Sequence, residues 1–71
     1  MAKRNLDLTI TRKGRTEAVL DLFADPDDVG TLQGALLGWL EGNKWAKGRW
    51  GEFEMLIRYS GEGKVRRKVR A

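Results

Sequence analysis

The chain has 71 residues with no cysteine and no histidine, and its 14 Lys and Arg against 10 Asp and Glu give a net charge of +4 at pH 7. A chain this short forms at most one domain (1–71), without disulfides or thiolate metal sites. Lacking histidine, it has no usual general base near neutral pH, and a small domain hardly encloses a water-excluding pocket, so we expect a non-enzymatic protein without cofactor or metal.

The first part of the chain predicts a hairpin of two strands, 5–12 and 16–23. Three apolar residues in each strand alternate with their neighbours, namely Leu6, Leu8 and Ile10, then Ala18, Leu20 and Leu22. A three-residue loop at 13–15 sets these two apolar rows opposite each other, whereas a two-residue loop would place Ile10 against Glu17. We therefore expect the three-residue loop, which also places Asp7 opposite Asp21.

A helix is predicted over 26–41. Asp25 suits the N-cap, Pro26 suits the first helical position, and the carboxylates of Asp27 and Asp28 suit the positive end of the helix dipole. The apolar stripe expected to face the sheet consists of Val29, Leu32, Leu36 and Leu40. Because capping accounts for the three aspartates, they do not indicate a metal site.

Gly30, Gly34 and Gly38 recur at every fourth position inside this helix, on the side away from the apolar stripe. Each costs about 1 kcal/mol relative to alanine at an exposed helical site. A smooth glycine face admits another backbone at close range, so it is a candidate interface for a second copy or a host protein. The alternative is a helix under weak selection for stability.

The last part of the chain predicts a second hairpin, with strands 52–60 and 64–70. The residues expected to face inward are Phe53, Met55, Ile57 and Tyr59. A three-residue loop at 61–63 pairs Tyr59 with Val65, Ile57 with Arg67, and Met55 with Val69, and it places Glu54 opposite Arg70. The cationic strand 64–70 has the composition of an exposed edge. Arg67 alternates onto the inward side, where it must reach solvent or a carboxylate.

These elements predict an α+β fold of the type ββαββ, in which two hairpins form a single antiparallel sheet and one helix packs on one face. The strand order within the sheet stays open. No apolar run has the length of a signal peptide or a membrane span, so we expect a cytoplasmic protein that does not bind membranes.

Three basic segments are candidate nucleic-acid contacts. Their residues are Arg12, Lys13 and Arg15 in the first hairpin, Lys44, Trp45, Lys47, Arg49 and Trp50 in the connection, and Arg66, Lys68 and Arg70 in the last strand. Indole rings stack on unpaired bases and cations bind phosphates, a combination suited to single strands. Alternatively, Trp45 and Trp50 cover the end of the core, and the cations keep a loop and an edge strand in solvent.

In length, and in its use of Arg, Gly, Asp and Trp without Cys or His, the chain resembles the small accessory proteins encoded by phages of high-GC actinobacteria. The resemblance implies a protein that binds and redirects a host macromolecule. Our leading hypothesis is a nucleic-acid-binding module. The alternative is a protein-binding modulator or inhibitor of a host factor, homodimeric through the glycine face or the edge of strand 64–70. Exposure of Trp45 and Trp50 favours the first, and their burial favours the second.

Overall fold

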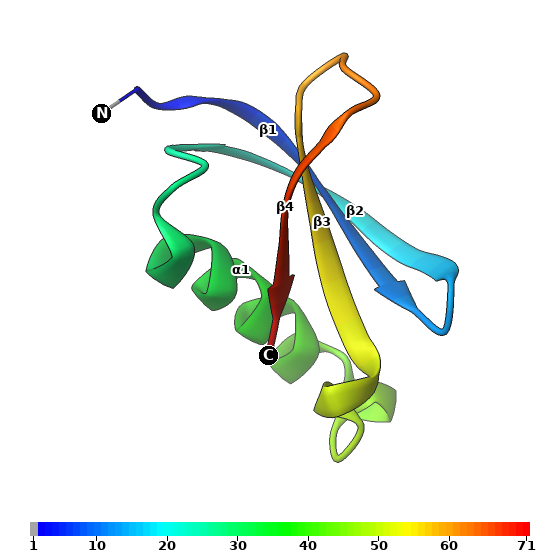
Figure 1. The fold of residues 1–71 in the computed structure, drawn as a ribbon. Helices are drawn as coiled ribbons and strands as arrows, with labels where there is room; N and C mark the ends of the chain where they lie inside the picture. Colours follow the sequence, from blue (N-terminus) through cyan, green and yellow to red (C-terminus); the bar gives the residue numbers. More distant parts are fainter. Residues whose placement is uncertain (1) are drawn as a thin grey trace.

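The computed structural model describes residues 2–71, which form one four-stranded antiparallel sheet in the order β2-β1-β3-β4 and one α-helix. The elements in chain order are β1 (Arg4–Arg12), β2 (Arg15–Ala24), α1 (Val29–Gly42), the short 3-10 helices η1 (Lys44–Ala46) and η2 (Trp50–Glu52), β3 (Phe53–Tyr59) and β4 (Val65–Arg70). The helix lies on one face of the sheet (Figure 1). The α+β fold of type ββαββ is confirmed, and the open question of strand order is answered: β1 and β3 are central, and β2 and β4 are the edges.

The core lies between α1 and the inward-facing rows of β1 and β3. The side chains that are at most 1% exposed include Leu6, Leu8 and Ile10 of β1, Phe53, Met55 and Ile57 of β3, and Leu32, Leu36 and Leu40 of α1. Their period-2 and helical spacings therefore predicted the core correctly. Val29 is the exception, because it begins the helix beyond the core and is 41% exposed.

In the first hairpin the predicted register is confirmed, but the predicted turn is wrong. Leu8 pairs with Leu20 as expected, whereas Arg12 pairs with Arg15 across a two-residue turn. Both turn residues have positive φ, 52° at Lys13 and 78° at Gly14, a geometry that matches the twist of the flanking strands. One unpaired residue of β2, Glu17, forms a bulge that restores the apolar register beyond it.

The second hairpin shows the same kind of correction. The pairs of Met55 with Val69, Ile57 with Arg67, and Glu54 with Arg70 are as predicted, but Val65 pairs with Arg58 instead of Tyr59, and Arg66 is the bulged residue. The ladder stops at the pair of Arg58 and Val65, and the amide of Glu62 donates to the carbonyl of Tyr59 at 3.0 Å, which closes a β-turn over residues 59–62. The residue with the left-handed conformation in this turn is Gly61, with φ of 82°.

The helix begins at Val29 and not at Pro26. The amide of Asp28 donates to the Asp25 carbonyl at 3.0 Å, and the Asp27 amide donates to Asp25 Oδ1 at 2.9 Å. Pro26 therefore occupies the second position of a β-turn, which suits its fixed φ as well as a first helical turn does. Asp28 takes the capping role predicted for Asp25.

Asp28 caps α1 through both oxygens of its carboxylate. The Thr31 amide donates to Oδ1 at 3.2 Å, and the Thr31 hydroxyl donates to Oδ2 at 2.7 Å. These hydrogen bonds, that of the hydroxyl first, hold the pKa of Asp28 below its ordinary value. The ionised form is therefore the capping form.

Replacing Asp28 with alanine should lower the midpoint of thermal unfolding by several degrees at pH 7, because two hydrogen bonds at the helix start are lost. The pKa of Asp28 is lower in the folded protein than in the unfolded chain, where it is about 3.9. The stabilisation is therefore fully present above the unfolded-state pKa and is lost as the pH falls through the folded-state pKa. In thermal scans followed by circular dichroism, the difference in unfolding midpoint between the wild type and Asp28→Ala should therefore become smaller below about pH 4. Asp28→Asn, which keeps the acceptor oxygen, is the control. An equal deficit for Ala and Asn would contradict the capping role.

The inward-facing Arg67 reaches a carboxylate, which is one of the two outcomes that its position predicted. Its Nε donates to the Pro26 carbonyl at 3.0 Å, and its Nη2 donates to Asp27 Oδ1 at 3.3 Å. The side chain therefore connects β4 to the turn that precedes α1.

Candidate functional site

The turn between β1 and β2 meets the connection between α1 and β3 at one end of the sheet. Arg12, the last residue of β1, pairs with Phe53, the first residue of β3. Arg12 Nε donates to Glu52 Oε1 at 3.0 Å, and Lys13 Nζ lies 3.6 Å from the same oxygen. Two of the predicted basic segments, distant in sequence, are therefore neighbours. We call the surface formed by residues 12–15 and 43–52 the basic end.

The connection 43–52 is held against the core at its ends and in its middle. The Asn43 side-chain amide donates to the Trp39 carbonyl at 2.7 Å, and Ala46 of η1 is fully buried. Gly48 has φ of 82°, a conformation that glycine adopts without strain, and it allows the chain to reverse between η1 and η2. The side chains of Lys44, Lys47 and Arg49 are left exposed on this fixed backbone.

Trp45 packs on the core with part of its ring and exposes the rest. It stands edge-on to Trp39 with ring centroids 6.2 Å apart, and its centroid lies 5.6 Å from that of Phe53. The Arg12 guanidinium carbon is 5.7 Å from the Trp45 ring centroid, within range of a cation–π contact. The residue is nevertheless 43% exposed. Trp45 thus combines a fixed ring with an accessible surface.

Trp50 is placed differently. Its ring packs against the hydrophobic core and is mostly covered. Its indole N–H is buried and has no hydrogen-bond acceptor among residues 2–71. Of the two indoles in the connection, Trp45 is therefore the one with a surface available for stacking.

The cations of the basic end, together with Lys68 and Arg70 of β4, fall into two groups. Arg12 and Lys13 share the Glu52 carboxylate, and at the neighbouring end of β4 Arg70 Nη2 lies 3.1 Å from Glu54 Oε2. The hydrogen bond from Arg12 holds the pKa of Glu52 below its ordinary value, so this carboxylate stays charged. The second group is exposed and lacks a carboxylate partner within residues 2–71: it comprises Arg15, Lys44, Lys47 and Arg49, with Lys68 on the outer face of β4.

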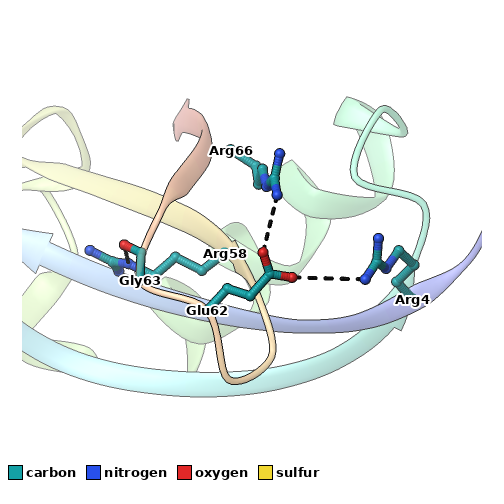
Figure 2. A network of polar contacts seen from close by, with 5 residues as sticks. All are labelled: Arg4, Arg58, Glu62, Gly63 and Arg66. Atoms are coloured by element: carbon teal, nitrogen blue, oxygen red, sulfur yellow. Dashed lines mark hydrogen bonds and ion pairs between the residues drawn. The ribbon is translucent and has the colours of Figure 1, made fainter.

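Arg66 does not belong to this surface, although the sequence grouped it with Lys68 and Arg70. Its bulge lies near the opposite end of β4, where its Nη2 donates to Glu62 Oε1 at 3.1 Å (Figure 2). Arg4 approaches the other oxygen of Glu62 at 3.9 Å. The guanidinium carbons of Arg4 and Arg66 lie 3.8 Å and 4.2 Å from the ring centroid of Tyr59. Arg66 is thus engaged in a local cluster that fixes the β3–β4 turn.

Comparison with known proteins finds no matching family model, no similar curated protein and no similar solved structure. Within residues 2–71, no helix is long and apolar enough to cross a membrane. The same residues contain no group of three or more acidic side chains placed to hold a metal ion. The arrangement of the side chains is therefore the basis for a functional assignment.

The glycine face of α1 lies in solvent. Gly30, Gly34 and Gly38 are exposed, and within residues 2–71 a Cβ added at Gly34 or Gly38 would meet no atom within 4 Å beyond its chain neighbours and the adjacent helix backbone. The only neighbour of a Cβ at Gly30 is Asp28 Oδ1, at 3.7 Å. The face is smooth and outward-pointing, as its spacing predicted, but nothing in residues 2–71 identifies an occupant for it.

A surface that sequence reasoning missed is the outer side of β2. Val19 and Phe23 point away from the core and are 61% and 62% exposed. The signal was present in the sequence, because β2 carries apolar residues on both sides of its alternation, whereas the outward residues of β1 are polar.

Proposed function

We propose that this protein is a non-enzymatic module that binds single-stranded nucleic acid at the basic end. In this proposal Trp45 stacks on an unpaired base, and Arg15, Lys44, Lys47 and Arg49 contact the phosphates on either side. The observation that carries it is the placement of Trp45, an accessible indole held by the core. It lies in a connection whose exposed cations, Lys44, Lys47 and Arg49, have no carboxylate partner within residues 2–71.

The indole ring and the exposed cations bind different parts of a nucleic acid. An aromatic platform contributes about 1–3 kcal/mol for each stacked base and accepts any base, because every base has a π-face. Cations add affinity by displacing the counterions of the phosphate backbone. Bases in a duplex already stack on one another, so an exposed indole favours single strands.

The paired cations support the site indirectly. Glu52 ties Arg12 and Lys13 to the start of β3, which fixes the β1–β2 turn relative to Trp45. Arg15, on the far side of that turn, has no carboxylate partner within residues 2–71 and is free to contact a phosphate.

The test is a titration of the intrinsic tryptophan fluorescence with short single-stranded and duplex oligonucleotides at two salt concentrations. We expect quenching by single strands, weaker binding of duplex, and an affinity that falls steeply with salt. Absence of single-strand binding at low salt would overturn the proposal.

A charge-matched pair of double variants locates the site. Lys47→Gln with Arg49→Gln should reduce the salt slope by roughly 1.4, since each phosphate contact on a single strand contributes about 0.7. Lys3→Gln with Lys64→Gln makes the same charge change near the Arg4 and Glu62 end, and it should leave the slope almost unchanged. Equal effects of the two double variants would indicate attraction by net charge alone and not by a site at the basic end.

A further inference from the structure

The β2 strand forms an open edge of the sheet along ten residues, Arg15–Ala24. Its outward row includes Val19 and Phe23, two of the most exposed large apolar side chains in residues 2–71. Its inward row, Ala18, Leu20 and Leu22, is only half-buried, because α1 approaches the sheet on the β4 side. Both faces of this edge therefore present apolar surface beside unpaired backbone.

The hydrogen-bond pattern identifies which backbone groups are free. The carbonyl of Asn5 accepts from the Ser60 amide, so the odd-numbered residues of β1 direct their backbone groups toward β3. In an antiparallel strand the N–H and C=O of one residue point to the same side. The β2 residues opposite those positions are Val19, Asp21 and Phe23. Each of the three thus directs both backbone groups away from β1 and toward the open edge.

After Arg15, the charged residues of this edge are all acidic. Asp21 lies beside Asp7, as predicted, and Glu17 sits at the bulge, whereas no cation occurs in β2 after Arg15. None of these three carboxylates has an ion-pair partner within residues 2–71. The other edge, β4, is cationic and is protected against pairing in the way natural sheets use. The β2 edge has no cation after Arg15, and its bulge at Glu17 leaves residues 18–24 in regular register and open to pairing.

A second copy of the chain is a poor occupant. Pairing of β2 with β2 brings the acidic side chains of two copies together, and like charges across strands are destabilising. Pairing of β2 with β4 matches the charges, but it joins two different surfaces and leaves a free edge at each end, so it generates open chains instead of a closed assembly.

We propose that the β2 edge binds an extended segment of another protein by strand addition, with a cation of that segment opposite Asp21 and apolar residues opposite Val19 and Phe23. Backbone hydrogen bonds at Val19, Asp21 and Phe23 provide the pairing, as in other strand-addition complexes. Apolar side chains on the inner side of the segment extend the row of Leu20 and Leu22. This site is separate from the basic end and does not depend on nucleic-acid binding.

The test uses two capped peptides that differ at one position. Each has a central charged residue, arginine or glutamate, flanked on both sides by leucine, then valine, then threonine and lysine. The symmetrical order fits an antiparallel or a parallel approach. With the labelled protein followed by nuclear magnetic resonance, the arginine peptide should shift the amide signals of β2, and the glutamate peptide should bind at least about tenfold more weakly.

Charge reversal in the protein provides the cross-check. Asp21→Lys should reverse the preference, so that the glutamate peptide binds more tightly than the arginine peptide. Val19→Pro places a ring at an outward-facing N–H, which an edge strand tolerates, and it should weaken both peptides. Circular dichroism establishes that each variant is folded. If Val19→Pro unfolds, Asp21→Lys at the exposed Asp21 side chain still decides the question.

Three results would overturn the proposal. The first is a set of peptide-induced amide shifts centred on residues outside β2. The second is a preference for the arginine peptide that Asp21→Lys does not reverse. The third is concentration-dependent self-association of the free protein, measured by sedimentation, that Asp21→Lys abolishes. The last result would assign the β2 edge to a second copy.

Discussion

Replacing Phe53 with alanine should destabilise the fold by about 3–5 kcal/mol, the range for deleting a fully buried aromatic side chain. Phe53 is 0% exposed and is the largest of the fully buried side chains. Its ring lies 5.6 Å from the ring centroids of both Trp39 and Trp45. A domain this small has a total stability in the lower part of the usual 5–15 kcal/mol, so the variant should keep little or no stability margin and should unfold at a much lower urea concentration.

Urea unfolding followed by circular dichroism and by tryptophan fluorescence measures this effect. Phe53→Leu keeps most of the buried volume and is the matched control, with an expected loss smaller than that of alanine. A change below about 1 kcal/mol for Phe53→Ala would mean that the connection 43–52 repacks to fill the space.

Replacing Trp45 with alanine should weaken single-strand binding by about 1–3 kcal/mol, or roughly 5- to 150-fold, because the stacking surface is lost while the surrounding cations remain. The salt dependence should be nearly unchanged, since no phosphate contact is removed. Because Trp45 also packs on Phe53, binding must be compared at a temperature at which circular dichroism shows both proteins folded.

Trp50→Phe is the control for this experiment. It keeps an aromatic ring in the core and removes an indole N–H that lacks an acceptor within residues 2–71. Trp50→Phe should still bind single strands and show most of the fluorescence quenching, because the quenching on binding comes chiefly from Trp45. If Trp50→Phe abolished quenching and Trp45→Ala did not, the stacking surface would have been assigned to the wrong indole.

Much of the fold followed from local periodicity. The alternation in residues 6–10 and 53–57 and the helical spacing of Leu32, Leu36 and Leu40 identified the elements and their buried sides. Burial of one face also selected the register of the first hairpin. The turns were less predictable, because a bulge lets a two-residue and a three-residue turn lead to the same register. Pro26 suits a β-turn and a helix start equally well, so the sequence did not distinguish them.

The candidate site depended on non-local pairing. Arg12 lies beside Glu52 because β1 pairs with β3, and the sequence left the strand order open. The exposed surface of Trp45 and the covered ring of Trp50 likewise depend on how the connection 43–52 packs on the core, which periodicity does not show. Arg66 was grouped with its sequence neighbours, but the bulge at its position directs it to Tyr59 and Glu62.

The position of β1 and β3 at the centre of the sheet has a consequence for folding. Each hairpin closes over a short turn, and isolated hairpins form within about 1–10 μs. Joining β1 to β3 instead brings together residues as far apart as Arg12 and Phe53, and pairings of long sequence separation form later. The basic end draws one half from the first hairpin and the other from the connection 43–52 that leads into the second, so we expect it to be absent from either hairpin alone and to arise only in the step that unites them. Acquisition of single-strand binding during refolding would then report that step directly.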